Sequence, residues 1–223
     1  MINLSVKTDR MDITWALSSG YIFVQQRWRY VWIDESGRNP WTIQEKRDFH
    51  NSSDKWIWHF WSSKAYAMIG DNSKLAHEYR NTKFTINVDI RWVTGHEDEH
   101  WTVYVRKVNP NSQVDWLNRK LYLHYKDDIE YRGIQGRVDS TMTYAQVGVG
   151  HEFGHTFGNT SQLHNIDSIR QMHGDEYKEP LLSLYKDDAS IMSVGNDVRQ
   201  RHYDFLKSQL KNMINHDVEI YMF

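Results

Sequence analysis

The chain has 223 residues, a formal net charge of −2 at pH 7 and a mean hydropathy of −0.74, a length that suits one substantial domain. The near-neutral charge gives no reason to expect a nucleic-acid partner, and no apolar run approaches the roughly 20 residues of a membrane-spanning helix. Because the chain has no cysteine, disulfides, thiolate metal sites and a cysteine nucleophile are excluded, and any metal must be held by His, Asp or Glu.

The first part of the chain combines strand and helix patterns. Its N-terminal segment lacks the basic start and apolar stretch of a Sec signal peptide, so export would need another route. Residues 20–34 are rich in β-forming side chains and predict one or two strands. Residues 41–69 have apolar side chains at helical spacing, and Thr42 with Glu45 has the spacing of a capping box.

Two alternating segments follow, at residues 84–94 and 101–108. Each places apolar side chains on one face, and the short polar segment between them predicts an antiparallel hairpin. The edge of that hairpin could bind a peptide substrate as an extra strand. Residues 114–125 predict another strand pair or one long strand.

The last part of the chain contains two predicted helices. Residues 140–157 form the first, which Ser140 and Thr141 could cap. Residues 197–214 form an amphipathic C-terminal helix, whose apolar side consists of Val198, Phe205, Leu206, Leu210, Met213 and Ile214. No repeat or linker interrupts the chain. We therefore expect one α+β domain over residues 1–223, with a strand-rich part at 1–139 and the two helices at 140–223.

The motif His-Glu-x-x-His occurs twice, and on a helix its two histidines lie one turn apart and can reach one metal ion. The first copy, residues 96–100 (HEDEH), contains three acids and lies between the two alternating segments. Its histidines would sit at the end of a hairpin and not on a helical face. We interpret this copy as a solvated turn without a metal role.

The second copy, residues 151–155 (HEFGH), lies within the predicted helix 140–157. Gly158 follows where a helix can end with a left-handed residue. Three further glycines, at positions 148, 150 and 154, each cost about 1 kcal/mol relative to alanine inside a helix. We expect a compensating reason, such as close packing against a neighbour or a substrate strand. The alternative is a buried helix with two ordinary histidines.

Residues 151–158 (HEFGHTFG) resemble the first part of the metzincin zinc signature, HExxHxxGxxH. Residues 190–193 (SIMS) resemble the metzincin Met-turn, a tight turn beneath the zinc site, with Met192 as its methionine. The chain departs from the signature at Ser161, which stands where metzincins have their third zinc-binding histidine. A neutral serine is a poor zinc ligand compared with His, Asp or Glu.

Further segments resemble a narrower group. The order HEFGH, Gly158-Asn159, Asp175-Glu176-Tyr177, SIMS and residues 199–202 (RQRH) is similar to bacterial metallopeptidases of polymorphic toxins and of type VI secretion spike proteins. This resemblance covers residues 151–202. It implies a zincin-like domain with a twisted, mainly antiparallel sheet, an active-site helix and a C-terminal helix. It also implies a secreted effector, with a peptide or protein substrate and an immunity protein or a secretion spike as partners.

Catalytic zinc sites usually have three protein ligands and a water, so two histidines leave one ligand to be identified. Glu176 is the first candidate, since an acid from a later segment can complete a His-His-Glu site. Asp175 is the alternative. It follows Gly158-Asn159 after an insertion of about fifteen residues, and without that insertion it would fall near the third metzincin ligand. The other candidates are His164, His173 and Glu179. A solvated acidic turn is the competing interpretation of Asp175-Glu176.

The sequence thus predicts a zinc-dependent metallopeptidase in which His151 and His155 bind Zn²⁺ and Glu152 is the general base. His202 could donate a hydrogen bond to the oxyanion, support a carboxylate ligand, or be a surface histidine. Arg199 and Arg201 are expected in structural ion pairs. The alternative functions are a zinc amidase acting on peptidoglycan or another non-protein amide, and a non-catalytic zinc-stabilised binding module. We expect delivery by a secretion system, to the outside or to a target-cell periplasm, and otherwise a cytoplasmic location.

Overall fold

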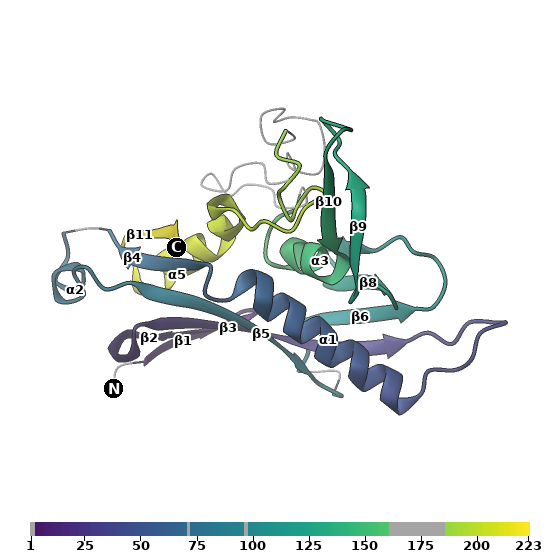
Figure 1. The fold of residues 1–223 in the computed structure, drawn as a ribbon. Coiled ribbons are helices and arrows are strands. Elements are labelled where there is room, and N and C mark those ends of the chain that lie inside the picture. Colours follow the sequence, from purple (N-terminus) through teal and green to yellow (C-terminus); the bar gives the residue numbers. More distant parts are fainter. Residues whose placement is uncertain (1–2, 71, 96–97, 161–185) are drawn as a thin grey trace.

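A computed structural model describes residues 3–70, 72–95, 98–160 and 186–223. These residues form a mixed α+β fold, as expected, in which helices and short segments cover a large sheet (Figure 1). The strands are β1 (Asn3–Lys7), β2 (Asp12–Ala16), β3 (Tyr21–Trp32), β4 (Ala65–Ile69), β5 (Phe84–Trp92), β6 (Trp101–Arg106), β7 (Gln113–Asp115), β8 (Lys120–His124), β9 (Glu130–Gln135), β10 (Thr143–Val147) and β11 (Val218–Met222). The helices are η1 (Leu17–Ser19), α1 (Ile43–Trp61), α2 (Lys74–Glu78), α3 (Gly148–Thr156), η3 (Gln200–Tyr203) and α5 (Asp204–Ile214).

The main sheet has the strand order β11-β4-β5-β3-β6-β8-β7, and β2 joins β1 to the first half of β3. The alternation predicted for β5 is confirmed, because Phe84, Ile86, Val88 and Ile90 are all buried. The strand pair predicted within 114–125 is also confirmed, as β7 and β8 pair antiparallel. One apolar face of the sheet therefore forms the core, as period-2 patterning requires.

The predicted hairpin between residues 84–94 and 101–108 is wrong. Both β5 and β6 run parallel to β3, which lies between them. The connection crosses β3 near Trp28, where the His100 amide donates to the Arg27 carbonyl at 2.8 Å. β3 is 12 residues long, so one of its edges accommodates β2 and then β6 in succession. The main sheet is still mainly antiparallel, as expected, because five of its strand pairs are antiparallel and only β3–β5, β3–β6 and β6–β8 are parallel.

Helix α1 accounts for the first part of the segment predicted as helical, and the rest becomes β4. The capping box is confirmed: the Thr42 hydroxyl accepts from the Glu45 amide at 3.1 Å, and the Glu45 carboxylate accepts from the Thr42 amide at 2.8 Å. The helix lies across β5 with Phe49, Ile57, Phe60 and Trp61 buried (Figure 1). Its C-terminal residues reach α3, where they contribute to the functional site.

The helix predicted over 140–157 begins later than expected. Residues Thr143–Val147 form β10, which pairs antiparallel with β9 in a separate two-stranded ribbon. Ser140 and Thr141 are therefore not the helix cap; α3 begins at Gly148, with Val147 in extended conformation before it. The ribbon stands away from the main sheet and leads directly into α3 (Figure 1). Pairing with β9 outweighs the helical spacing in this stretch.

The C-terminal helix is shorter than predicted, since η3 precedes α5 and the helix proper starts at Asp204. Its predicted apolar side is confirmed: Phe205, Leu206 and Leu210 are buried, and the other predicted positions pack against the same core. Strand β11 follows and pairs with β4, a strand that the sequence pattern did not indicate. Among the described residues, no helix has the length and apolar character needed to cross a membrane.

Candidate active site

Helix α3 carries the second His-Glu-x-x-His copy and ends as the sequence predicts. Gly158 has a φ of +106°, a conformation that L side chains rarely adopt. Its amide donates to the His155 carbonyl at 3.1 Å, and the Asn159 amide donates to the Gly154 carbonyl at 3.1 Å. These two bonds form a Schellman motif, which satisfies the last carbonyls of the helix. The chain therefore turns sharply at Gly158, one residue after the cap of the helix.

The glycines of α3 are explained by close packing against two neighbours. A Cβ at Gly154 would lie 2.2 Å from Met192 Sδ and 3.0 Å from the Trp61 ring. A Cβ at Gly150 would lie 2.9 Å from the Phe60 ring. The Trp61 indole also donates to the Gly150 carbonyl at 3.1 Å. The expected close approach to a neighbour is confirmed, and it fixes α3 tightly between α1 and the segment around Met192.

The residues predicted as a Met-turn form a tight turn against α3. The Ser193 amide donates to the Ser190 carbonyl at 2.9 Å, and the Met192 amide donates to the Ser190 hydroxyl at 3.1 Å. Ile191 and Met192 are both buried. This turn supplies a backbone carbonyl to His151 on the helix above it, so residues far apart in the chain position one side chain.

Both histidines of α3 are oriented by backbone carbonyl groups. His151 Nδ1 lies 2.7 Å from the Ile191 oxygen, and His155 Nδ1 lies 2.6 Å from the Asn159 oxygen. Because a carbonyl oxygen only accepts, these short contacts favour a proton on each Nδ1 and a lone pair on Nε2. The Gln146 amide nitrogen lies farther from His151 Nδ1, at 3.3 Å, and donates to the Ser193 carbonyl at 2.8 Å. The two ring centroids are 4.9 Å apart. This is the tautomer and orientation that metal-binding histidines adopt when a backbone carbonyl supports them.

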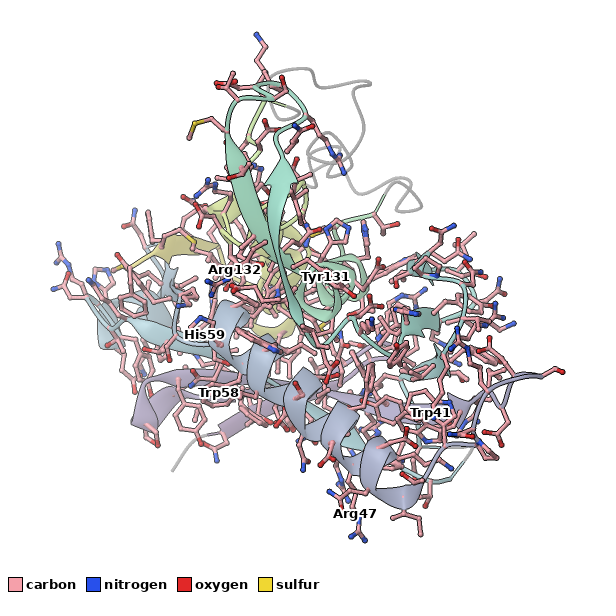
Figure 2. The ribbon with its side chains drawn as sticks, turned by 45° about the vertical axis from the view of Figure 1, so that its right-hand side comes forward. Trp41, Arg47, Trp58, His59, Tyr131 and Arg132 are labelled. Atoms are coloured by element: carbon pink, nitrogen blue, oxygen red, sulfur yellow. The ribbon has the colours of Figure 1, made fainter. Side chains whose placement is uncertain are left out.

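Glu152 lies beside a cavity of about 590 Å³. The carboxyl is buried with the side chain only 6% exposed, and it shares the cavity wall with His151. The remaining wall comes from the β6–β7 and β8–β9 connections, the β9–β10 ribbon and the turn after Met192, through Pro110, Asn111, Ser112, Asp127, Tyr131, Ile134, Arg137, Gln146, Gly148 and Ser193. Figure 2 shows Tyr131 and Arg132 on β9, at the base of the upright ribbon and above α1.

Asp127 and Gln146 are cavity residues that sequence reasoning missed. Burial raises the pKa of Asp127 to about 6, against hydrogen bonds from Ser112 and the His124 amide that lower it. The Gln146 amide donates to the Ser193 carbonyl at 2.8 Å and thus ties β10 to the turn beneath the helix. Neither residue belongs to a motif, and only the folded chain brings them to His151.

His202 lies behind the turn and not on the cavity wall. It is 1% exposed, its Nδ1 accepts from the Arg199 amide at 3.0 Å, and its Nε2 lies 3.3 Å from the Ser190 hydroxyl. Arg199 and Arg201 both pair with Asp187, which confirms the predicted ion pairs and lowers the pKa of Asp187 to about 2. The surface role predicted for His202 is therefore wrong, and its roles as an oxyanion donor or as the support of a carboxylate ligand stay predictions.

The candidates for the third ligand lie outside the described residues. These are Glu176, Asp175, His164, His173 and Glu179. Within the part of the chain that the structure describes, no group of three or more His, Asp or Glu side chains could hold a metal ion. The two histidines fit a metal in tautomer and spacing, and the third ligand stays a prediction because all its candidates lie outside the described residues.

The first His-Glu-x-x-His copy has a different setting. His96 and Glu97 lie outside the described residues, while His100 sits at the start of β6 and is 1% exposed. Its Nδ1 accepts from the Arg27 amide at 2.9 Å. Burial, aided by the nearby charge of Arg27, lowers the pKa of His100 to about 4. The interpretation as a solvated turn is therefore wrong for His100, which is a buried neutral residue linking β3 to β6.

Hydrogen bonding also links the sheet to the C-terminal end of α3. Gln26 on β3 is fully buried, and its side-chain oxygen accepts from the Thr156 hydroxyl at 3.0 Å.

The strand edge at 84–108 that was expected to bind substrate is not open. β6 lies between β3 and β8, and the outer amides of β5 donate to the Ser62 hydroxyl and the Asp54 carboxylate.

Comparison with known proteins gave no match, whether with family models, curated proteins or solved structures. The functional assignment therefore depends on the residues and the geometry of the site itself.

Proposed function

We propose that this protein is a zinc-dependent metallopeptidase whose site is built on α3. The observation that carries the proposal is the pair of carbonyl-supported histidines, His151 and His155, with Glu152 in the cavity beside them. With each Nδ1 held by a carbonyl, Nε2 is the nitrogen that would bind the metal, and the two rings lie one helical turn apart on α3. The motif resemblance to metzincins points in the same direction.

The roles of the residues follow from their chemistry. His151 and His155 would hold Zn²⁺ through Nε2, with an acid from the predicted set as the third ligand. When bound, the metal lowers the pKa of water toward neutrality and polarises the carbonyl of the scissile bond. Glu152 accepts the proton of the attacking water and passes it to the leaving amine. The buried position of Glu152 keeps this proton transfer away from bulk solvent.

The test separates the base from the ligands. Glu152→Ala should abolish cleavage in a fluorogenic peptide library while zinc content, measured by elemental analysis, stays at the wild-type level. Glu97→Ala is the matched control, because it removes the same residue from the first motif copy and should leave cleavage unchanged. Loss of zinc from Glu152→Ala, or full residual activity, would overturn the assignment.

The third ligand can be identified by the same measurement. We propose Glu176, with Asp175 as the alternative. Glu176→Gln and Asp175→Asn should differ, and the variant that loses zinc identifies the ligand. Retention of zinc by both variants would transfer the role to His164, His173 or Glu179.

The biological role is proposed from the resemblance to toxin and secretion-spike metallopeptidases. Expression in the bacterial cytoplasm and in the periplasm, with wild-type protein and Glu152→Ala, tests it. Toxicity in one compartment that requires Glu152 would support an effector enzyme, and a co-encoded binding protein that abolishes it would be an immunity partner. Cleavage of peptidoglycan amides without peptide cleavage would instead identify the amidase, and inert zinc-loaded protein would identify the binding module.

A further inference from the structure

The cavity contains a buried carboxyl group that the proposed mechanism does not use. Asp127 lies in the β8–β9 connection and is 7% exposed. Its Oδ2 accepts from the His124 amide at 2.7 Å and from the Ser112 hydroxyl, and its backbone carbonyl accepts from the Val149 amide at 2.9 Å. These bonds hold the carboxyl rigidly at the N-terminal turn of α3.

The other carboxyl oxygen lies directly against the first residue of the helix. A Cβ at Gly148 would lie 2.8 Å from Asp127 Oδ1, so only glycine leaves room for that oxygen. Gly148 and Asp127 line the cavity together with Glu152. Gly148 precedes Glu152 by about one helical turn, roughly 5.4 Å along the axis. Oδ1 thus lies close to the proposed reaction centre without being part of it.

The surroundings of Asp127 favour a ligand group that donates hydrogen bonds. Because burial raises its pKa only to about 6, the carboxyl is an anion at neutral pH, and an anion can only accept. Ser193 lines the same cavity, is 1% exposed, and its hydroxyl has no hydrogen-bond partner among the described residues. The one cationic side chain on this wall within the described residues, Arg137, is already engaged in an interaction.

We propose that Asp127 is a specificity-determining residue that selects substrates with a lysine or arginine side chain close to the bond that Glu152 attacks. This inference rests on the proposed peptidase function and names its substrate class. A cationic group would form a charge-assisted hydrogen bond with Oδ1, roughly twice as strong as one between neutral groups. An acidic side chain would be repelled by Asp127 and Glu152, and an apolar one would offer no donor to Asp127 Oδ1.

The variant Asp127→Asn removes the charge while preserving the fold. The amide oxygen of asparagine has two lone pairs and can keep the bonds from Ser112 and the His124 amide, so only the group facing the cavity changes. Asp128→Asn is the matched control. It removes one charge from the next residue of the same connection, and Asp128 is not on the cavity wall.

The probes are peptides that are identical except for one residue, which is Lys, norleucine, Gln or Glu and is scanned through each position. Their cleavage is measured as kcat/KM, and their binding to Glu152→Gln is measured by fluorescence anisotropy. At one peptide position, wild type and Asp128→Asn should cleave the Lys peptide with a higher kcat/KM than the norleucine peptide. In Asp127→Asn this kcat/KM ratio should fall roughly tenfold or more, which is the size of one charge-assisted hydrogen bond.

The outcomes separate this inference from the proposed function. Cleavage without a lysine preference, or a preference that persists in Asp127→Asn, would overturn the role of Asp127 and leave the peptidase assignment intact. Absence of cleavage with lysine-selective binding that depends on Asp127 would overturn the peptidase and leave the recognition role. Equal binding of the Gln and Lys peptides would show that Asp127 selects a neutral donor, which contradicts the proposal.

Discussion

Two copies of one five-residue motif lie in this chain, and the fold uses His100 of the first copy and the two histidines of the second in opposite ways. His100, in the first copy, accepts a backbone N–H at its Nδ1. His151 and His155, in the second copy, each place Nδ1 against a backbone carbonyl. In the first arrangement the Nδ1 lone pair accepts a hydrogen bond from strand β3. In the second, Nδ1 donates and the lone pair is on Nε2. Histidines of the same motif therefore differ in which ring nitrogen carries the proton, because a different backbone group lies beside each Nδ1.

The largest expected difference between the copies concerns metal binding. His155→Ala should lower the zinc content of the purified protein to near zero, because one of two helical ligands is lost. His100→Ala should keep the zinc but lower the free energy of unfolding by about 2 kcal/mol, because the buried Arg27 amide loses its partner. Elemental analysis and chemical denaturation check the two results. Zinc loss from His100→Ala would show that the copies are equivalent and would contradict the comparison.

A second test uses one glycine beside each copy. Gly158→Ala places a Cβ 2.3 Å from Phe205 Cβ at a positive φ, so the free energy of unfolding should fall by about 1–3 kcal/mol. Gly95→Ala meets its nearest neighbour, an Asp98 oxygen, at 3.7 Å and should change stability by less than about 0.5 kcal/mol. Urea denaturation measures both. Equal effects would mean that the turn after the second copy is no tighter than the segment before the first.

The pH dependence of stability provides a third test, specific to the first copy. The pKa of His100 is about 4 in the folded protein, below the usual value of 6.5. As pH falls from about 6.5 to 4, the unfolded chain binds a proton that the folded chain does not, so stability falls. His100→Asn can keep an acceptor for the Arg27 amide but cannot titrate. Its denaturation midpoint should depend less on pH in this window, and an unchanged slope would contradict the buried neutral state.

The pH dependence that Asp127 contributes to stability should have the opposite sign. Its folded pKa of about 6 lies above the usual value for aspartate, so the unfolded chain loses its proton first and stability falls as pH rises from about 4 to 6. Asp127→Asn should therefore gain stability relative to wild type across this window. Thermal denaturation at closely spaced pH values measures the difference. A constant difference would mean that the carboxyl is solvated.

The sequence by itself determined the features that depend on neighbouring residues. The capping box at Thr42, the left-handed end at Gly158 and the buried faces of β5 and α5 all follow from local spacing and backbone sterics. The preference for residues 151–155 over 96–100 as the metal motif also used local context, but the hairpin assumed for 96–100 is wrong and the metal role of 151–155 stays a prediction. These features are readable because each is decided within one or two turns of chain.

Only the tertiary structure decided the features that depend on partners distant in sequence. Alternation shows which face of a strand is buried but not which strand lies beside it, so the parallel placement of β5 and β6 around β3 was missed. Pairing with β9 moved the start of α3 to Gly148 for the same reason. The carbonyl beside His151 and the carboxyl of Asp127 reach the site from separate segments, and no local pattern encodes such a meeting.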